Sequence, residues 1–133
     1  MISDKYFQFF RDTEDERHVI LIGGRRSGKT WATIEYLDIL SRLTTEPCKI
    51  LVVTDEFAPL QRTMEDFKQV TGIAPHGSLV NGYTAETTYN AVWQFAHYHT
   101  PEKAQGTQCD FLFVNEAINV PYAVIAALLP AVR

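Results

Sequence analysis

The stretch that decides the fold of this chain reads Gly23-Gly24-Arg25-Arg26-Ser27-Gly28-Lys29-Thr30. An apolar run at residues 19–22 precedes it, and apolar residues at helical spacing follow it. The stretch matches the phosphate-loop pattern G-x-x-x-x-G-K-[ST] at every fixed position, between a predicted buried strand and a predicted helix. All eight residues are therefore predicted to form a loop that binds the phosphates of a nucleoside triphosphate.

The residue types of this loop suit phosphate binding. Gly23, Gly24 and Gly28 allow the backbone to turn tightly and to direct successive N–H groups at an anion. Lys29 places a positive charge on the terminal phosphates, and the Thr30 hydroxyl is suited to ligate Mg²⁺. The helix that begins here adds unpaired N–H groups and the positive end of its dipole.

The composition indicates a single globular domain over residues 1–133, with an N-terminal extension at residues 1–17. Hydrophobic residues make up 46% of the chain and charged residues 21%, which argues against a disordered protein. The formal net charge of -4 removes the simple argument for nucleic-acid binding by a basic domain. Any contact with DNA must then come from a local patch or from another segment.

Targeting and redox signals are weak in this sequence. No apolar run reaches the length of about 18 residues that a membrane span needs, and residues 1–17 carry too many charges for a signal peptide. The two cysteines, Cys48 and Cys109, are too few for a disulfide framework and suit a reducing cytosol.

Predicted strands and helices alternate along the chain. Apolar runs without a polar face predict buried strands at residues 18–22, 49–54 and 110–114. Helical spacing predicts a helix directly after the loop, a second from Pro59 to Gly72 and a last one at residues 122–129. This alternation predicts an α/β fold in which helices flank a mainly parallel sheet.

Residues 78–99 have a different character and predict a β-hairpin insertion. Asn81-Gly82 is a strong turn signal, and the extended segment that ends the insertion places Trp93 and Phe95 on one face. His97 and His99 share that face. A histidine pair without a third Cys, Asp or Glu partner nearby is a weak pattern for a metal site.

A second chemical motif lies at residues 109–116, where CDFLFVNE predicts a buried strand that ends in two polar residues. Ligands of open parallel sheets bind at the carboxyl ends of the strands. A phosphate-loop ATPase needs there a residue that orients Mg²⁺, usually Asp, and a carboxylate that positions and deprotonates the attacking water. Glu116 fits the second role. Asn115 occupies the position of the usual Asp and can accept a hydrogen bond from a magnesium-bound water, but it lacks the negative charge, so weaker metal binding is expected.

Together these motifs resemble the ATPase domain of the large subunit of tailed-phage terminases, the motor that pumps viral DNA into an empty capsid. The resemblance rests on the loop GGRRSGKT, on Lys103-Ala104-Gln105-Gly106 and on FLFVNEA at residues 111–117. It covers roughly residues 17–133. It implies a P-loop NTPase fold of the ASCE type, with ATP and Mg²⁺ as the bound species.

The resemblance also implies roles for individual residues. Lys29 and Thr30 would hold phosphate and Mg²⁺, with Asn115 as the second metal-site residue and Glu116 as the catalytic carboxylate. Arg25 would sense or stabilise the γ-phosphate. The plainer interpretation of Arg25 and of its neighbour, Arg26, is solvated charge beside a phosphate site.

The family further implies partners and a location. These are double-stranded DNA, the portal protein, the terminase small subunit and a homo-oligomeric ring, in the cytoplasm of an infected or lysogenic bacterial host. Arg62, on the second helix, is a candidate arginine finger toward a neighbouring subunit. Terminase large subunits continue with a coupling strand and an RNase H-like nuclease domain. The chain shows no three-carboxylate arrangement of that kind, so we expect no nuclease activity from it, as a fragment of a larger motor or as a truncated relative.

Two other functions remain open on the sequence alone. One is a helicase- or loader-type ATPase that acts on cellular nucleic acid. The other is a nucleotide-binding module that does not hydrolyse ATP. Its inactivity would follow from Asn115 in place of Asp and from the lack of the coupling strand.

Overall fold

Strands and helices alternate over residues 19–71, as predicted, and a run of strands that includes the predicted hairpin then precedes the last helix. A computed structural model describes residues 19–22, 29–43, 47–79, 82–87, 91–98, 108–116 and 119–132. The strands are β1 (Val19–Ile22), β2 (Cys48–Thr54), β3 (His76–Ser78), β4 (Gly82–Glu86), β5 (Ala91–His97) and β6 (Phe111–Asn115). The helices are α2 (Lys29–Leu43), α3 (Phe57–Thr71) and α5 (Tyr122–Leu128), and a 3-10 turn, η2 (Leu129–Ala131), follows α5.

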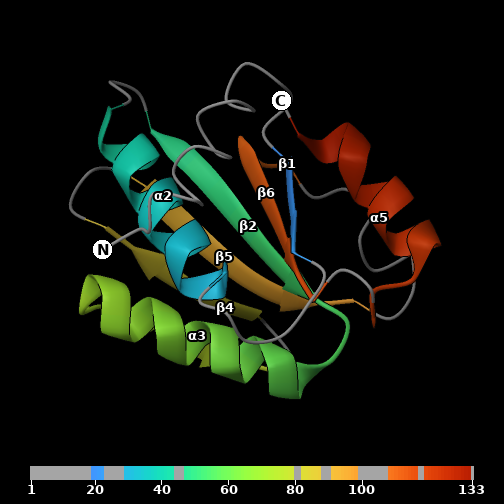
Figure 1. Cartoon of the computed structure of the whole chain (residues 1–133), viewed down its shortest axis with the longest axis horizontal. Helices are drawn as coiled ribbons and strands as arrows, with labels where there is room; N and C mark the ends of the chain where they lie inside the picture. Colours follow the sequence, from blue (N-terminus) through green and yellow to red (C-terminus); the bar gives the residue numbers. More distant parts are fainter. Residues whose placement is uncertain are drawn as a thin grey trace.

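The six strands form one sheet in the order β1-β6-β2-β5-β4-β3. The neighbours β1 and β6, β6 and β2, and β2 and β5 pair in parallel, whereas β4 and β3 are antiparallel additions at one edge. Figure 1 shows α2 and α3 on one side of the sheet and α5 on the other. The predicted α/β fold with a mainly parallel sheet is therefore confirmed.

The hairpin predicted at residues 78–99 is present, and it extends the main sheet. Its strands are β4 and β5, with Tyr83 opposite Phe95. Because β5 also pairs with β2 over its whole length, from Cys48↔Ala91 to Thr54↔His97, the hairpin is a lateral continuation of the parallel strands. The short strand β3 was not predicted, since His76-Gly77-Ser78 has no apolar alternation to reveal it.

The central strands are apolar on both faces because each face meets a different layer. Ile50 and Val52 of β2 pack in one core with side chains of α2 and α3, and Leu51 and Val53 pack in another with side chains of α5. All four are fully buried. A continuous apolar run is the expected pattern for a parallel strand that is covered on both faces.

Local sequence sets the ends of α3. Gly72 follows the helix with a φ of 79°, and its N–H donates to the Lys68 carbonyl at 2.7 Å. A left-handed residue after the last turn is the common way for a helix to end, and glycine adopts it without a steric cost. The predicted stop at Gly72 is confirmed, while the start lies at Phe57, which places Pro59 within the first turn.

Two segments meet β6 just ahead of its first residue. On the β2 side, the Asp110 N–H donates to the Lys49 carbonyl at 2.8 Å, and Asp110 Oδ2 accepts from the Lys49 N–H at 2.8 Å. Val132 forms a parallel bridge with Cys109. Because β2 occupies one side of β6 here, Val132 lies on the side that β1 occupies further along.

Candidate functional site

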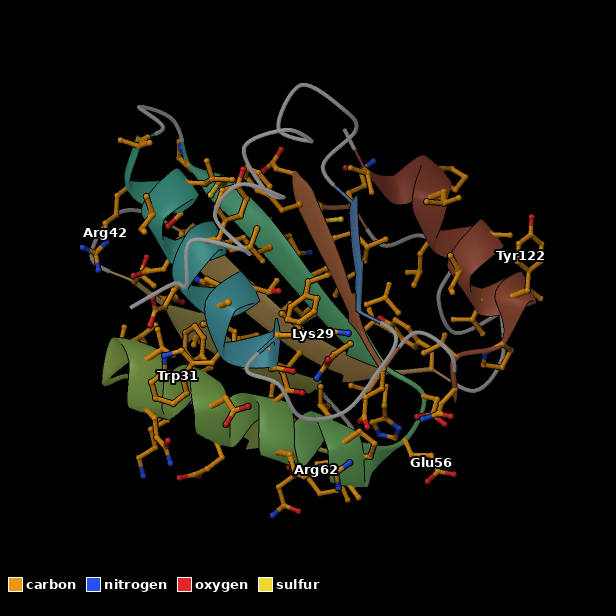
Figure 2. The ribbon with its side chains drawn as sticks, in the orientation of Figure 1. Lys29, Trp31, Arg42, Glu56, Arg62 and Tyr122 are labelled. Carbon is orange, nitrogen blue, oxygen red and sulfur yellow. The ribbon has the colours of Figure 1, made fainter. Side chains whose placement is uncertain are left out.

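The ends of β1 and β6 bring the two predicted motifs together. Ile22, the last residue of β1, is opposite Asn115, the last residue of β6. The next helix, α2, begins at Lys29, whose side chain extends toward the carboxyl ends of the central strands (Figure 2). This edge is where ligands bind in open parallel sheets.

Thr30 and Asn115 are joined directly. The Thr30 hydroxyl lies 3.1 Å from Asn115 Oδ1 and donates to it. The Glu116 N–H donates to the same oxygen at 3.1 Å. Asn115 is buried, so its amide needs partners for both its oxygen and its nitrogen. The sequence placed Thr30 and Asn115 at one metal site, and the structure brings these two residues together.

The nitrogen of the same amide points to α3. Asn115 Nδ2 donates to the Thr63 hydroxyl oxygen at 2.7 Å, and the Thr63 hydroxyl in turn donates to the Pro59 carbonyl at 2.9 Å. Thr63 is fully buried on the face of α3 that meets the sheet. Sequence reasoning missed Thr63. The signal that could have revealed it is a polar residue among the buried positions of an amphipathic helix, because such a residue requires a partner.

Glu116 lies in the turn after β6 with its side chain almost fully buried. Its φ is 54°, in the left-handed region, and its carbonyl accepts a hydrogen bond from the Asn119 N–H at 2.9 Å. Its Oε2 lies 3.3 Å from Arg62 Nη2, in an ion pair with the half-exposed guanidinium. Figure 2 shows Arg62 on α3. The proposal that Arg62 reaches a neighbouring subunit stays a prediction; here its partner is Glu116 of its own chain.

Other predicted site residues lie outside the described residues. These are Gly23, Gly24, Arg25, Arg26, Ser27 and Gly28 of the loop, the segment 103–106, the extension at residues 1–17, and His99. Their predicted roles stay predictions, as do the catalytic roles of Lys29 and Glu116.

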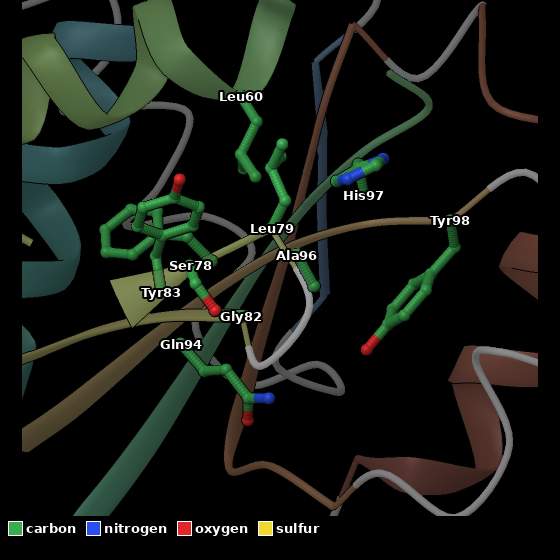
Figure 3. Close-up of a pocket in the computed structure, with 10 residues that line it drawn as sticks. Leu60, Ser78, Leu79, Gly82, Tyr83, Gln94, Ala96, His97 and Tyr98 are labelled. Carbon is green, nitrogen blue, oxygen red and sulfur yellow. The ribbon is translucent and has the colours of Figure 1, made fainter. Parts of the chain in front are cut away.

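A separate cavity of about 320 Å³ opens beside the hairpin (Figure 3). Its walls come from β3, β4, β5 and the first turns of α3, and they include Leu60, Tyr83, Gln94, His97 and Tyr98. The His97 ring meets the Phe57 ring edge-on, with 6.0 Å between the centroids. Thr30, Asn115 and Glu116 do not line this cavity, so it is distinct from the group of side chains at the ends of β1 and β6.

The donors at the ends of β1 and β6 suit a hard cation that also contacts phosphate. Oxygen ligands are those that Mg²⁺ prefers, and it usually takes only one or two from the protein. The Thr30 hydroxyl and the Asn115 amide oxygen supply that chemistry. Within the described ranges there is no cluster of three His, Cys, Asp or Glu side chains that could hold a metal alone. Among the same residues, no helix has the length and apolarity to cross a bilayer.

The fold is shared with proteins of known structure. The chain is similar to the large terminase of a thermophilic bacteriophage in complex with ADP, with a TM-score of 0.71 and 15% identity over 98% of this chain and 36% of the terminase. A second crystal form of that terminase gives a TM-score of 0.74 and 14% identity, with the same coverage. The chain thus spans about a third of the length of these relatives.

Sequence comparison identifies no relative of this chain. No protein-family model matches the chain, and no curated protein matches it significantly. The terminase likeness predicted from the motifs is confirmed at the level of the fold, and at this identity the likeness shows the fold alone.

Proposed function

We propose that this chain is the ATP-hydrolysing domain of a viral DNA-packaging motor. The observation that carries the proposal is the meeting of Thr30, Asn115 and Glu116 at the ends of two adjacent parallel strands. The fold is that of a large terminase, and one structure of that terminase is a complex with ADP. The sequence of residues 23–30 supports nucleotide binding independently, because it matches the phosphate-loop pattern.

The residues would divide the work of hydrolysis. Lys29 would contact the terminal phosphates, and Thr30 and Asn115 would hold Mg²⁺, which neutralises charge that develops on the transferred phosphoryl group. Glu116 would orient the attacking water and accept its proton. Its carboxylate is buried, follows the strand end directly and is paired with Arg62, and these observations support such a role. Arg25 would stabilise the γ-phosphate.

The motor context adds partners to the proposal. ATP hydrolysis would be coupled to translocation of double-stranded DNA into a procapsid. The motor would be a ring of subunits bound to a portal protein, and the terminase small subunit would deliver the DNA to it. The net charge of -4 gives the chain no general attraction to DNA, which suits contact through an assembled ring.

The first test is phosphate release from Mg-ATP by the wild type beside Lys29→Ala and Glu116→Gln. We expect Lys29→Ala to lose nucleotide binding. Glu116→Gln should keep binding and lose turnover by about 10²-fold or more, because an amide cannot accept the proton of the attacking water. Lys68→Ala and Glu86→Gln are matched controls, since both side chains are exposed and lie away from these strand ends. Unchanged turnover in Glu116→Gln would remove the catalytic assignment.

The same assay separates the motor from its alternatives. Stimulation by portal protein and double-stranded DNA supports a packaging motor, whereas stimulation by single-stranded DNA without any capsid protein supports a helicase or loader. ATP binding with no phosphate release, even after assembly, would identify a binding module.

A further inference from the structure

We propose that Thr63 of α3 is a positioning residue that sets which way the Asn115 amide faces, and that it thereby prepares the Thr30 hydroxyl to bind Mg²⁺. This inference rests on the proposed function, and nothing in the sequence pattern assigns Thr63 a role.

The first step is the direction of the hydrogen bonds at Thr63. A hydroxyl group carries one hydrogen, and the Thr63 hydroxyl donates it to the Pro59 carbonyl at 2.9 Å. Its oxygen therefore faces Asn115 as an acceptor. The distance of 2.7 Å from Thr63 Oγ1 to Asn115 Nδ2 is that of a well-formed hydrogen bond.

The second step follows at Asn115. Because Thr63 presents an acceptor, the NH₂ group of the amide must point to α3, and Oδ1 must point the other way. The Glu116 N–H makes the same demand, since it donates to Oδ1 at 3.1 Å. Both residues are buried, so water does not replace either bond. This geometry suits an amide at a position where an Asp is usual, because a carboxylate could bond to Thr63 only if the Thr63 hydroxyl gave up its bond to the Pro59 carbonyl.

The orientation of the Asn115 amide in turn fixes the hydroxyl hydrogen of Thr30. With Oδ1 turned toward it, the Thr30 hydroxyl donates its hydrogen to Asn115 at 3.1 Å. Both of its lone pairs then remain for a cation. A reversed amide would present NH₂ to Thr30, and the hydroxyl hydrogen would then occupy the side where a cation must approach. Thr63, together with the Glu116 N–H, thus sets the polarity of a chain of hydrogen bonds that ends at the predicted metal ligand.

The chain offers a matched control on the same helix. The Thr71 hydroxyl donates to the Phe67 carbonyl at 2.8 Å, four residues back, as Thr63 does to Pro59. It also accepts a bond, from the Ile73 N–H at 3.1 Å. Thr71→Val therefore removes the same kind of hydroxyl from α3, at the C-terminal end of the helix.

The test compares Thr63→Val, Thr63→Ser and Thr71→Val in the full chain. We measure the Mg²⁺ dependence of ATP binding by calorimetry, and the Asn115 side-chain NH₂ signal by NMR without nucleotide. Thr63→Val should raise the Mg²⁺ concentration needed for tight ATP binding about tenfold, as expected when a group that orients a metal ligand is lost. It should also shift or broaden the Asn115 signal. Thr63→Ser and Thr71→Val should behave as the wild type.

Three outcomes overturn the inference, and a fourth is distinct from them. A wild-type Mg²⁺ dependence in Thr63→Val overturns the role of Thr63, and so does an unchanged Asn115 signal. An equal change in the Mg²⁺ dependence of Thr71→Val would also overturn the inference, because the effect would then reflect the general stability of α3. If the wild type itself bound no Mg-ATP, the proposed function would fail, while the NMR comparison would still decide whether Thr63 orients Asn115.

Discussion

Glu116 adopts a backbone conformation that costs free energy. Its φ is 54°, and among the described residues no other non-glycine residue has a positive φ. For an L-residue the left-handed region is unfavourable by about 1 kcal/mol, because Cβ approaches the backbone. The cost is offset by the Asn119 N–H that closes the turn and by the ion pair with Arg62. Strain of this kind collects at functional sites.

This strain gives a prediction for two truncations. Glu116→Gly and Glu116→Ala both remove the carboxylate, but alanine keeps the Cβ that opposes the left-handed conformation. We expect Glu116→Gly to be more stable than Glu116→Ala by about 1 kcal/mol in urea unfolding.

The same exchange at a helical position supplies the control. Ala126 is exposed in α5, and glycine there should lower the free energy of unfolding by about 1 kcal/mol relative to alanine. The sign should therefore be opposite at the two positions. Equal stability of the two Glu116 variants would contradict the strain.

The sequence motifs placed Thr30 and Asn115 at one site, but the contacts of α3 with the end of β6 could not be predicted from the sequence. The phosphate loop and the strand end at Asn115 and Glu116 were predictable, because each is a local pattern. Thr63 is 52 positions from Asn115, and Arg62 is 54 positions from Glu116. No local spacing encodes such contacts, since they depend on where α3 packs against the sheet.

At the scale of elements, α3 connects the strand ends to the core. Successive residues of its second turn contact the end of β6 and the residue after it, Thr63 at Asn115 and Arg62 at Glu116. Met64, the next residue, and Phe67, one turn further, are buried in the core that includes side chains of β2 and β5. A shift of α3 would therefore reach the predicted metal-site residue Asn115 and the predicted catalytic carboxylate of Glu116 at once.

The stability of α3 should depend on pH through Asp66. Burial raises the pKa of this carboxyl above its usual 3.8, and the neighbouring Glu65 charge adds to the effect. The folded protein then holds the proton more tightly than the unfolded chain. The free energy of unfolding consequently falls as pH rises from 3.8 through the raised pKa, and the loss persists at neutral pH.

The matching experiment is urea unfolding of Asp66→Asn between about pH 3 and pH 7. We expect Asp66→Asn and the wild type to be similar at the acidic end, and the variant to be the more stable protein at neutral pH. Glu86→Gln, which neutralises an exposed carboxylate on β4, is the control for a change in net charge. If Asp66→Asn showed the wild-type slope, the effect would not belong to Asp66.

Elements were predictable where their signal is local. The run in β2 and the stop of α3 at Gly72 are of this kind. The pairing of β5 with β2 was not, because the two strands lie far apart along the chain. The strand β3 was missed for another reason: its partner β4 is close in sequence, but His76-Gly77-Ser78 has no apolar alternation. The register Cys48↔Ala91 joins residues that no pattern relates.

At the scale of the whole molecule, one sheet separates two cores. The larger core lies under α2 and α3 and is dominated by aromatic rings. Phe67 is fully buried, with ring centroids 4.8 Å from Trp93 and 5.2 Å from Phe95. The smaller core lies under α5; its buried side chains are aliphatic apart from Cys109, and Tyr98 packs against it.

Phe67→Ala should therefore destabilise the molecule as a unit. Loss of the ring and the resulting cavity should lower the free energy of unfolding by about 3–5 kcal/mol, measured in urea. Phe67→Leu, which leaves a smaller cavity, should cost less and keep the chain folded. Leu43→Ala is the control, since this side chain is 74% exposed at the end of α2 and should change stability by no more than about 0.5 kcal/mol. A loss in Leu43→Ala equal to that in Phe67→Ala would contradict this account of the core.

Because Val132 bridges Cys109, two segments of the chain, Val132 and β1, pair along the same edge of β6 and of the residues just before it. Val132 takes the position beside Cys109, and β1 takes the next positions, from Leu112 to Asn115. A strand-forming extension joined after Val132 would run in the same direction, into the backbone groups that β1 now uses. This edge of β6 can pair with only one strand at a time. If the extension paired there, β1 would be displaced from β6 and would move away from Asn115 by one strand spacing, about 4.8 Å.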